Sequence, residues 1–399
     1  MNTQEYIDLE RQFGAHNYKP LDVVLTEGHG VWVKDVDGKR YLDCLSAYSA
    51  VNQGHCHPRI VKAMTSQAKR LALTSRAFRN DKLPILYKKL HELTGYGMSL
   101  PMNSGAEAVE TALKVARKWA YESKKIAKYD AEIIVAAGNF HGRTITIVSF
   151  STEQFYKDAF GPFTPGFKVV TYGDLEELRN AITPNTAAIM LEPIQGENGV
   201  IVPPQGYIAG VAQLCKENNV LFIADEIQTG LCRTGKWFAC QHENVRPDIL
   251  VIGKALSGGM YPVSAVLADE AILGLIQPGE HGSTFGGSPV AAAVALAALE
   301  VLEEGHLDQR AEELGAYFMD QLRQIKSPVV KEVRGKGLLI GVELYPEAGG
   351  ARKYCEMLQK KGILAKETHD NVIRFAPPLI IEKKTLDWAL KRIAKVLAK

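Results

Sequence analysis

Residues 221–230 read LFIADEIQTG, an apolar run that ends abruptly in two carboxylates, Asp225 and Glu226. A short uninterrupted run of Leu, Phe and Ile is typical of a strand that is buried on both faces of a sheet. A free carboxylate at the end of such a strand is unfavourable unless a cation meets it. The stretch therefore predicts a fully buried strand and a positively charged group close to Asp225.

The same pattern recurs on both sides of this stretch. From about residue 100 to residue 270, apolar strand candidates alternate with segments of helix length. The candidates are EIIVAAG (132–138), FKVVTY (167–172), AAIMLEP (187–193), VLFIADE (220–226), ILVIGK (249–254) and PVSAVLA (262–268). This alternation predicts the α/β class, with a mainly parallel sheet flanked by helices. Active sites of such sheets lie beyond the carboxyl ends of the strands.

The two ends of the chain show other patterns. Residues 30–45 alternate apolar and polar residues around an Asp-Gly pair, which predicts a β-hairpin. The last hundred residues predict an Ala-rich helix, two strand segments and an amphipathic surface helix, at residues 291–305, 331–344, 371–379 and 383–399. We therefore expect a large domain at residues 51–285 and a smaller α+β domain built from residues 1–50 and 286–399.

Composition excludes several classes of protein. The chain has 399 residues, with 47 Lys plus Arg against 45 Asp plus Glu, so its formal charge of +2 offers no basic surplus for nucleic acid. No apolar segment approaches the roughly 18 residues of a membrane span, and the polar start is unlike a signal peptide. Six scattered cysteines suit free thiols in a reducing compartment. We expect a cytoplasmic protein that acts on small molecules.

Three motifs resemble functional sites but lack a required residue. Residues 55–57 (HCH) have no second pair of ligands at metal-binding spacing, so no metal site is expected. Residues 230–236 (GLCRTGK) begin like a nucleotide-binding P-loop, but Trp237 stands where that motif needs Ser or Thr. Residues 335–337 (GKG) have no third glycine at dinucleotide-binding spacing. Neither class of nucleotide-binding protein is favoured.

Lys254 carries the strongest chemical signal. It ends the apolar run DILVIG and is followed by small residues that leave room for a bulky group. Burial lowers the pKa of a lysine from about 10.4, and the neutral amine can then form an imine with a carbonyl compound. The alternative is a lysine that extends its charged end into solvent. Pyridoxal 5'-phosphate binds proteins through such an imine and needs an acidic partner for its ring nitrogen.

Asp225 is the candidate for that acidic partner. An ion pair at about 4 Å, with an effective dielectric constant of about 20, contributes roughly 4 kcal/mol. At about 1.4 kcal/mol per pKa unit, this keeps a weakly basic ring nitrogen protonated at neutral pH. The protonated ring then withdraws electrons from a bound substrate. The alternative role for Asp225 is a helix cap after the strand.

The cofactor's phosphate needs an anion site, and two stretches offer one. Residues 103–107 (NSGAE) open a segment with helical spacing, whose first amide groups attract anions. The serine and glutamate of this stretch also fit a capping box, and the two roles are compatible. Ser283 and Thr284 form the second candidate. Phe140, in a glycine-bounded loop, either stacks on a flat ring or belongs to the core.

The chain resembles the class III, fold type I pyridoxal phosphate-dependent aminotransferases from end to end. The resemblance runs through HNYKPLDVVLTEG, LSAYSAVNQGHCHP, LTSRAFRND, LPMNSGAEAVETA, GNFHGRT, EPIQGENGV, FIADEIQTGLCRTG, GKALSGGMYPVSAVL, GEHGSTFGG, RGKGLL and IRFAPPL. It implies the fold type I architecture, with a large sheet domain and a small domain from both chain ends. It also implies a homodimer with shared active sites and small-molecule substrates.

The resemblance assigns the cofactor contacts. Lys254, which bonds to the cofactor, and Asp225, which holds its ring nitrogen, are implied to be catalytic. The other contacts are implied to come from Phe140 on the ring, Gln228 on the phenolic oxygen, and Ser104, Gly105 and Ala106 on the phosphate. Ser283 and Thr284 are implied to reach the phosphate bound by the other subunit, which makes the homodimer part of the mechanism.

Within the family, the chain is similar to the members that use ornithine. This implies transfer of the δ-amino group of L-ornithine to 2-oxoglutarate, giving glutamate and glutamate 5-semialdehyde, which cyclises to pyrroline-5-carboxylate. Arg143 is implied to bind the α-carboxylate of ornithine, and Tyr18 and Tyr48 to line the site. Glu197 is implied to hold Arg374 while ornithine reacts, and then to free it for the α-carboxylate of glutamate or 2-oxoglutarate.

The substrate remains the most open part of this assignment. The FHGR motif and a glutamate like Glu197 occur widely in class III, so only Tyr18 and the SAYSAVNQGH stretch separate ornithine from acetylornithine or 4-aminobutyrate. His141 stands where animal members usually have Trp, so the packing over the substrate is expected to differ. Glu192, at the end of its strand candidate, is also expected in the substrate site. A non-catalytic cofactor-binding protein is the alternative from another class.

Overall fold

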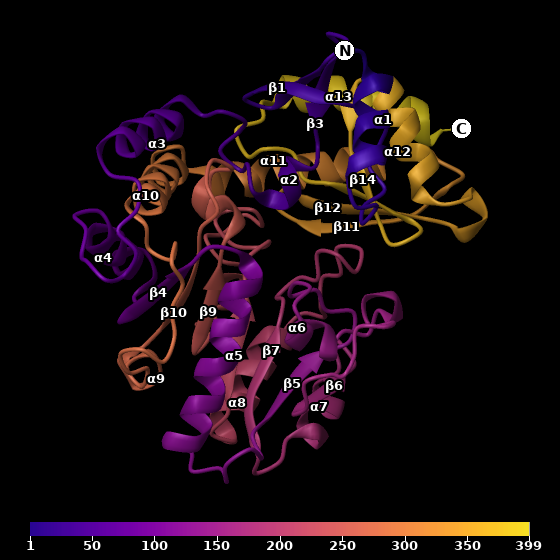
Figure 1. Ribbon diagram of the computed structural model, residues 1–399. Helices are drawn as coiled ribbons and strands as arrows, with labels where there is room; N and C mark the ends of the chain where they lie inside the picture. The colour runs from indigo at the N-terminus through magenta and orange to yellow at the C-terminus, as the bar shows by residue number, and fades with distance from the viewer. Residues whose placement is uncertain (399) are drawn as a thin grey trace.

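The apolar run at residues 221–225 is the middle strand of a seven-stranded sheet in the computed structural model, which describes residues 1–398 (Figure 1). In spatial order the strands are β4 (Met98–Met102), β10 (Ser264–Ala268), β9 (Ile249–Ile252), β8 (Leu221–Asp225), β7 (Thr186–Leu191), β5 (Glu132–Ala136) and β6 (Phe167–Val170). Six strands run in the same direction, and β10 alone runs opposite to them. The prediction of a mainly parallel sheet is confirmed, although β4 was not predicted.

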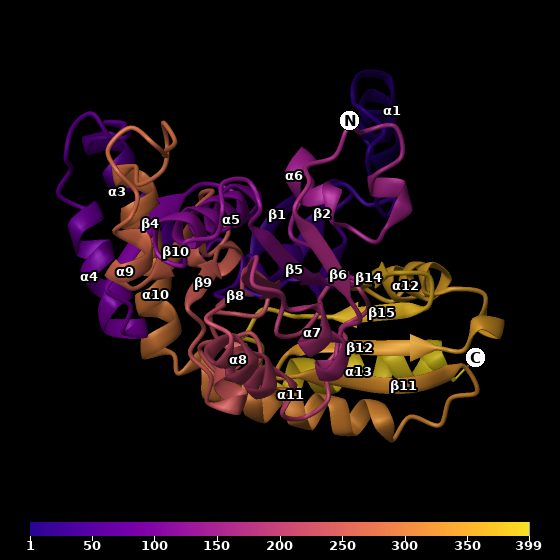
Figure 2. The same cartoon turned by 90° about the horizontal axis from the view of Figure 1, so that it is seen from below.

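Helices cover both faces of this sheet, as predicted. Leu221 and Ile223 pack into a core with α5 (Gly105–Glu122), whereas Phe222 and Ala224 pack into a second core with α8 (Tyr207–Glu217). Successive side chains of a strand point to opposite faces, so the two cores lie on opposite sides of the sheet. Figure 2 shows α5 and α8 on these two sides.

The remaining helices surround the sheet and the smaller region beside it. Near the large sheet lie α3 (Pro58–Arg70), α4 (Leu83–Thr94), α6 (Ile145–Ser149), α7 (Leu175–Ala181), α9 (Glu270–Leu273) and α10 (Pro289–Glu304). The smaller region contains α1 (Thr3–Phe13), α2 (Ser46–Ser49), α11 (Leu307–Arg323), α12 (Ala351–Lys360) and α13 (Lys383–Leu397). Short 3₁₀ turns are η1 (Gln154–Tyr156), η2 (Ala239–Glu243), η3 (Lys254–Ser257) and η4 (Pro346–Ala348).

Both chain ends build the smaller region, where indigo and yellow segments lie together in Figure 1. One sheet contains β1 (Leu25–His29), β2 (Trp32–Asp35), β3 (Arg40–Asp43) and β13 (Ile363–Leu364). The other contains β11 (Val330–Lys336), β12 (Leu339–Leu344), β15 (Val372–Phe375) and β14 (Lys366–Thr368). The predicted hairpin is confirmed by the antiparallel pair β2–β3, and β3 pairs with β13 from the far end of the chain.

The domain boundaries remain a prediction. Helix α10, which the prediction assigns to the small domain, packs against α3 through residues such as Ile60, Val294 and Ala298. Among residues 1–398, no helix has the length and apolar character to cross a membrane. The same residues contain no cluster of three or more His, Cys, Asp or Glu side chains arranged to hold a metal ion.

A buried arginine joins the two regions. The segment that begins like a P-loop places Arg233 fully out of solvent. Its guanidinium donates to the carbonyls of Leu338 at 2.9 Å and Pro377 at 2.7 Å, and to Oδ1 of Asn52 at 2.5 Å. Burial lowers the pKa of Arg233. Three distant segments therefore depend on one side chain for their hydrogen-bond donors.

We expect Arg233→Met to lower the free energy of unfolding by about 3 kcal/mol or more, because each buried acceptor left without a donor costs about 1–3 kcal/mol. Chemical denaturation measures the loss. Arg70→Met is the control, since Arg70 forms an exposed ion pair with Asp81 and should cost less than about 1 kcal/mol. Equal losses in the two variants would contradict the assigned role of Arg233.

Candidate active site

Asp225 and Lys254 meet at the carboxyl edge of the large sheet. Asp225 is the last residue of β8, and Lys254 follows β9 by one intervening residue. The two strands pair in parallel, with Asp225 opposite Val251, and both side chains line a cavity of about 210 Å³. Lys254 has a backbone φ of +43°, which residues with side chains rarely adopt. Such strain is tolerated where a side chain must be held in a defined place.

His141 contacts the acid directly. Its Nδ1 lies 2.6 Å from Oδ2 of Asp225, and both side chains are buried. The other carboxylate oxygen, Oδ1, accepts a hydrogen bond from the amide of Ile227 at 3.0 Å. Burial lowers the pKa of His141, but the hydrogen bond to Asp225 and its charge outweigh burial and raise it. The residue expected to change the packing over the substrate therefore lies against the carboxylate of Asp225.

Glu192 lines the same small cavity rather than the larger one described below. Its carboxylate accepts hydrogen bonds from the amides of Phe140 at 3.1 Å and Gly196 at 3.4 Å. Burial raises the pKa of Glu192 to about 7; His141 opposes this shift and Asp225 adds to it. The cavity thus combines the Asp225 carboxylate, which contacts His141, with a second acid that holds its proton up to near neutral pH.

The small cavity fits pyridoxal 5'-phosphate. It offers an acid for the ring nitrogen, an amine for the aldehyde and, at Gly105 and Ala106, the first amides of an 18-residue helix for the phosphate. A Cβ added at Gly105 would lie 3.0 Å from the side chain of Ile227, so a larger residue would fill the space. Burial lowers the pKa of Lys254, which favours the neutral amine.

The predicted capping box at the start of α5 is present. The Ser104 hydroxyl accepts from the Glu107 amide at 3.2 Å, and Glu107 accepts from the Ser104 amide at 2.6 Å. Ser283 and Thr284, the second candidate for the phosphate, line neither cavity of their own chain. The Ser283 hydroxyl instead accepts from Asn103 at 2.7 Å.

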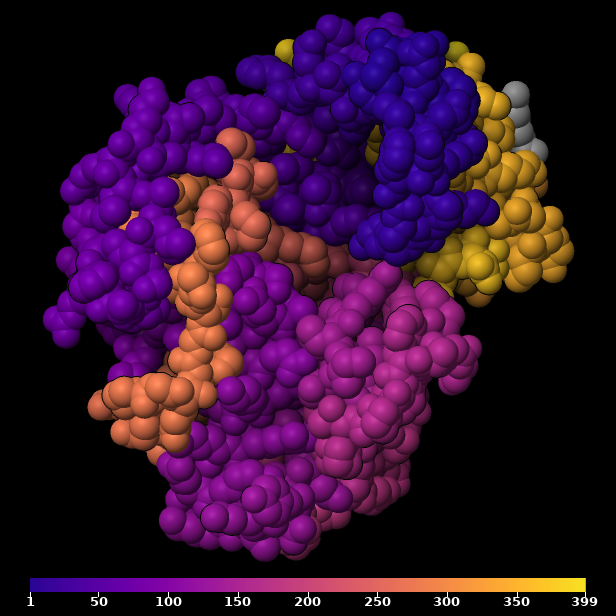
Figure 3. All heavy atoms as spheres, viewed as in Figure 1, coloured from indigo at the N-terminus to yellow at the C-terminus, as the bar shows by residue number. Residues whose placement is uncertain are grey.

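A larger cavity of about 940 Å³ opens beside the small one, and Phe140 lines both. Figure 3 shows a hollow between the indigo N-terminal segment and the magenta segment below it. Tyr18, Tyr48, Arg143 and Glu197 line this cavity, as does Tyr156, which the sequence did not indicate. The Arg143 guanidinium lies 4.6 Å from the ring of Tyr156 and 5.7 Å from the ring of Tyr18. Aromatic faces thus hold a cation at the cavity wall.

Glu197 and Arg374 form an ion pair, which we call the gate pair, in which the arginine is buried and the glutamate is 26% exposed. One terminal nitrogen of Arg374 donates to Glu197 at 2.6 Å and to Oε1 of Gln228 at 3.1 Å, and Gln228 in turn donates to Glu197 at 3.2 Å. Burial raises the pKa of Glu197, but the Arg374 guanidinium outweighs it and the pKa is lowered. The Nε and the second terminal nitrogen of Arg374 are buried without a partner. Arg374 lines neither cavity, whereas Glu197 lines the large one and Gln228 the small one.

Tyr48 reaches the gate pair from a left-handed turn. Its ring lies 4.8 Å from the guanidinium carbon of Arg374. The four residues Ser46–Ser49 have φ values of +52°, +46°, +60° and +72°, which sequence patterns did not reveal. The Ser46 hydroxyl donates to the carbonyl of Ala376 at 2.6 Å, and Asp43 accepts from the Ser46 amide at 2.9 Å. These bonds hold the strained turn against β15.

Comparisons with known proteins give a consistent result. A family profile described as Aminotransferase class-III matches residues 13–397. An ornithine aminotransferase from Geobacillus sp. (strain WCH70) is 59% identical over 99% of this chain and 99% of its own.

Two solved structures are also similar. An ornithine aminotransferase from Toxoplasma gondii, described as having partial occupancy of PLP at its active site, has a TM-score of 0.98 at 47% identity and covers 99% of this chain and 94% of its own. An acetylornithine aminotransferase from Elizabethkingia anophelis has a TM-score of 0.91 at 50% identity and covers 100% of this chain and 99% of its own.

The raised pKa of Glu192 predicts a pH-dependent stability. Its protonated form is favoured in the folded chain, so its stabilising contribution is complete below the ordinary glutamate pKa of 4.5 and is lost as the pH rises through about 7. Glu192→Gln does not titrate. Relative to the parent protein, its free energy of unfolding should therefore rise by about 3 kcal/mol between acidic and mildly alkaline pH.

Denaturant titrations of the cofactor-free protein across this pH range measure that difference. Glu313→Gln, at an exposed position, is the control and should change the free energy of unfolding by less than about 0.5 kcal/mol at every pH. A constant difference between Glu192→Gln and the parent protein across the range would contradict the raised pKa.

Proposed function

The chain belongs to the class-III aminotransferases, and on this premise we propose that it transfers the δ-amino group of L-ornithine to 2-oxoglutarate. The products are glutamate and glutamate 5-semialdehyde, which cyclises to pyrroline-5-carboxylate. The observation that carries this proposal is the pairing of Arg374 with Glu197, because Glu197 lines the same large cavity as Arg143 and the site thus has two arginines for two different α-carboxylates. The two half-reactions alternate in a ping-pong scheme.

The small cavity performs the proton chemistry. Pyridoxal 5'-phosphate, when bound there, supplies an electron sink for the carbon that carries the reacting amino group. Asp225, fixed by His141 and the Ile227 amide, holds a proton at the ring nitrogen. Lys254, whose pKa burial lowers, removes the proton from the substrate carbon and returns it. Phe140 and Gln228, which line the same cavity, would hold the ring, and the amides of Gly105 and Ala106 would bind the phosphate.

The large cavity orients the substrate. Arg143 binds the α-carboxylate of ornithine, and Tyr18 and Tyr48 line the path that directs the distal amine toward Lys254. Glu197 stays paired with Arg374 during this half-reaction. When glutamate or 2-oxoglutarate enters, its α-carboxylate takes the unpartnered nitrogens of Arg374. A guanidinium suits either carboxylate, so the competition between them selects the half-reaction.

Acetylornithine is the second candidate substrate, because a solved acetylornithine aminotransferase is 50% identical to this chain. The ornithine assignment is supported by the higher identity to the Geobacillus relative. It is also supported by Tyr18, which lies beside Arg143 at the wall of the large cavity. We further propose a cytoplasmic location, which suits the six free thiols.

Purified protein assayed in parallel with ornithine, N-acetylornithine and 4-aminobutyrate tests the function. Ornithine should give a kcat/KM at least about 100-fold higher than the other two, since both analogues lack its free α-amino group and a site that hydrogen-bonds a substrate group rejects analogues without it. Lys254→Ala should lose turnover entirely while still folding. A preference for N-acetylornithine would reverse the assignment, and a coloured protein without transamination would favour a binding role.

We also propose a homodimer in which Thr284 reaches the other subunit's phosphate. Phe78 and Phe285 are large apolar side chains that are 74% and 47% exposed. Asn80 donates to the carbonyl of Gly287 at 3.2 Å, so the loops that carry Phe78 and Thr284 lie against each other. An apolar contact at this place would bring Thr284 to a second chain.

Phe78→Asp should convert the dimer to a monomer in sedimentation velocity and weaken cofactor binding by about tenfold or more, because a charge buried in an apolar interface is unfavourable. Tyr129→Asp is the control, at a side chain that is 91% exposed. Its mass and cofactor affinity should match those of the parent protein. A Phe78→Asp variant that stays dimeric would place the interface elsewhere.

A further inference from the structure

The loop that carries Glu197 is a strained turn. Gln195 and Ile201 exchange backbone hydrogen bonds of 3.1 and 2.9 Å, which close it. Val200 has a φ of +55° although its side chain is β-branched, and it is fully buried. We call residues 196–200 the gate turn. A β-branched residue stays in this conformation only when its surroundings hold it there.

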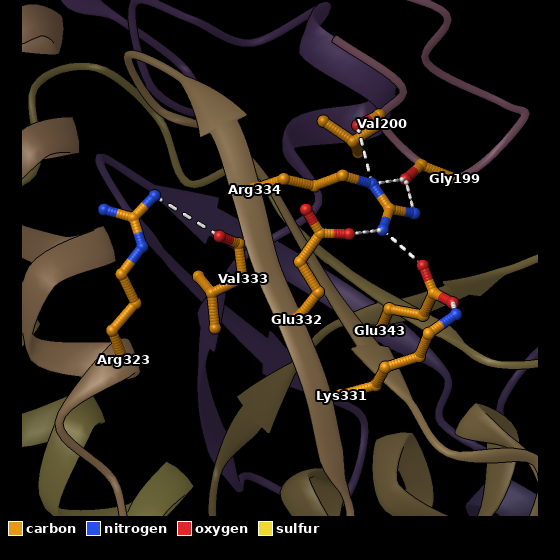
Figure 4. A network of polar contacts seen from close by, with 8 residues as sticks. All are labelled: Gly199, Val200, Arg323, Lys331, Glu332, Val333, Arg334 and Glu343. Carbon is orange, nitrogen blue, oxygen red and sulfur yellow. Dashed lines mark hydrogen bonds and ion pairs between the residues drawn. The ribbon is translucent and has the colours of Figure 1, made fainter.

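Arg334 on β11 holds the far end of the gate turn (Figure 4). Its Nε donates to the carbonyls of Gly199 at 3.2 Å and Val200 at 3.1 Å, and one terminal nitrogen donates to Gly199 at 2.8 Å. The other terminal nitrogen is paired with Glu332 at 2.7 Å and with Glu343. The side chain is only 13% exposed. Carbonyls on one side and carboxylates on the other fix the guanidinium plane.

Arg374 holds the near end of the same turn from the same sheet. In the register of β11, β12 and β15, Gly341 lies opposite both Arg334 and Arg374. Directly opposed residues of adjacent strands project on the same face, so the two arginines flank Gly341 on that face. A Cβ added at Gly341 would lie 3.1 Å from the carbonyl oxygen of Gly199. The glycine therefore lets the gate turn approach the sheet between the two arginines.

We propose that Arg334 is a positioning residue that keeps Glu197 directed at Arg374 and thereby sets the balance between the two half-reactions. This inference rests on the proposed ornithine and 2-oxoglutarate exchange. When the gate turn loosens, Glu197 no longer pairs with Arg374. Ornithine has a single carboxylate, and an uncovered Arg374 draws it away from Arg143, whereas glutamate uses Arg374 in its own half-reaction. Loss of the Arg334 contacts thus impairs the ornithine half-reaction selectively.

Arg334→Lys tests the proposed role of Arg334, because lysine keeps the positive charge but lacks the planar guanidinium that donates several hydrogen bonds at once. Hydrogen exchange on the full-length protein should show the amides of Val200 and Ile201 exchanging about tenfold faster, as expected when hydrogen bonds from a charged group are lost. Single-turnover rates with ornithine and with glutamate give the second readout. The ratio of kcat/KM for ornithine to that for glutamate should fall about tenfold.

Arg323→Lys is the matched control. Arg323 also donates to a β11 carbonyl, that of Val333 at 3.3 Å, but it does not contact the gate turn (Figure 4). Its exchange rates and its ratio of half-reactions should equal those of the parent protein. Arg334→Lys would overturn the proposal if exchange at the gate turn were unchanged. It would also do so if both half-reactions slowed by the same factor, since that result describes a purely structural residue.

Glu343→Gln provides a second test in case Arg334→Lys does not accumulate as folded protein. It removes a carboxylate that anchors Arg334 and leaves the carbonyl contacts in place, so the same two readouts should move in the same direction by a smaller factor. No change in either readout would overturn the proposal. The hydrogen-exchange measurement needs no substrate. It therefore tests whether Arg334 holds the gate turn even if the parent protein fails to transfer an amino group from ornithine.

Discussion

The parallel pairing of β8 with β9 is the constraint on which the active site depends. It places Asp225 opposite Val251 and brings the acid and Lys254 to one edge of the sheet. The register is set by the two cores, because Leu221 and Ile223 must face α5 while Phe222 faces α8. A slip of one residue would exchange these faces and turn the carboxylate away from the cavity. The packing of apolar side chains thus determines the geometry of the charged ones.

Charge compensation explains how so many ionisable groups share the small cavity. The Asp225 carboxylate contacts His141 at 2.6 Å, and this hydrogen bond replaces one that burial removes from solvent. Glu192 avoids a second negative charge by holding its proton up to about pH 7. Burial lowers the pKa of Lys254, which favours its neutral form. Each group is therefore accommodated by a different physical effect.

The sequence predicted the parts of the fold that depend on local patterns. Apolar runs marked the central strands, and Ser104 marked the start of α5. It did not predict β4, because Pro101 interrupts the pattern in a way that only an edge strand accommodates. The contact of His141 with Asp225 joins positions 84 residues apart, and no local signal encodes it. The left-handed turn at Tyr48 also has no local sequence signal, since tertiary hydrogen bonds rather than residue type impose it.

The proposed change of partners at the gate pair needs little motion. A single nitrogen of Arg374 serves Glu197, Gln228 and the carbonyl of Gly196, while its Nε and second terminal nitrogen have no partner. Buried donors without acceptors are unfavourable, so an incoming carboxylate gains the free energy that their pairing restores. Glu197 then has to yield at one nitrogen only, and the arginine itself stays in place. Because the gate turn is fixed at both ends by arginines, that exchange is a side-chain movement within a rigid frame.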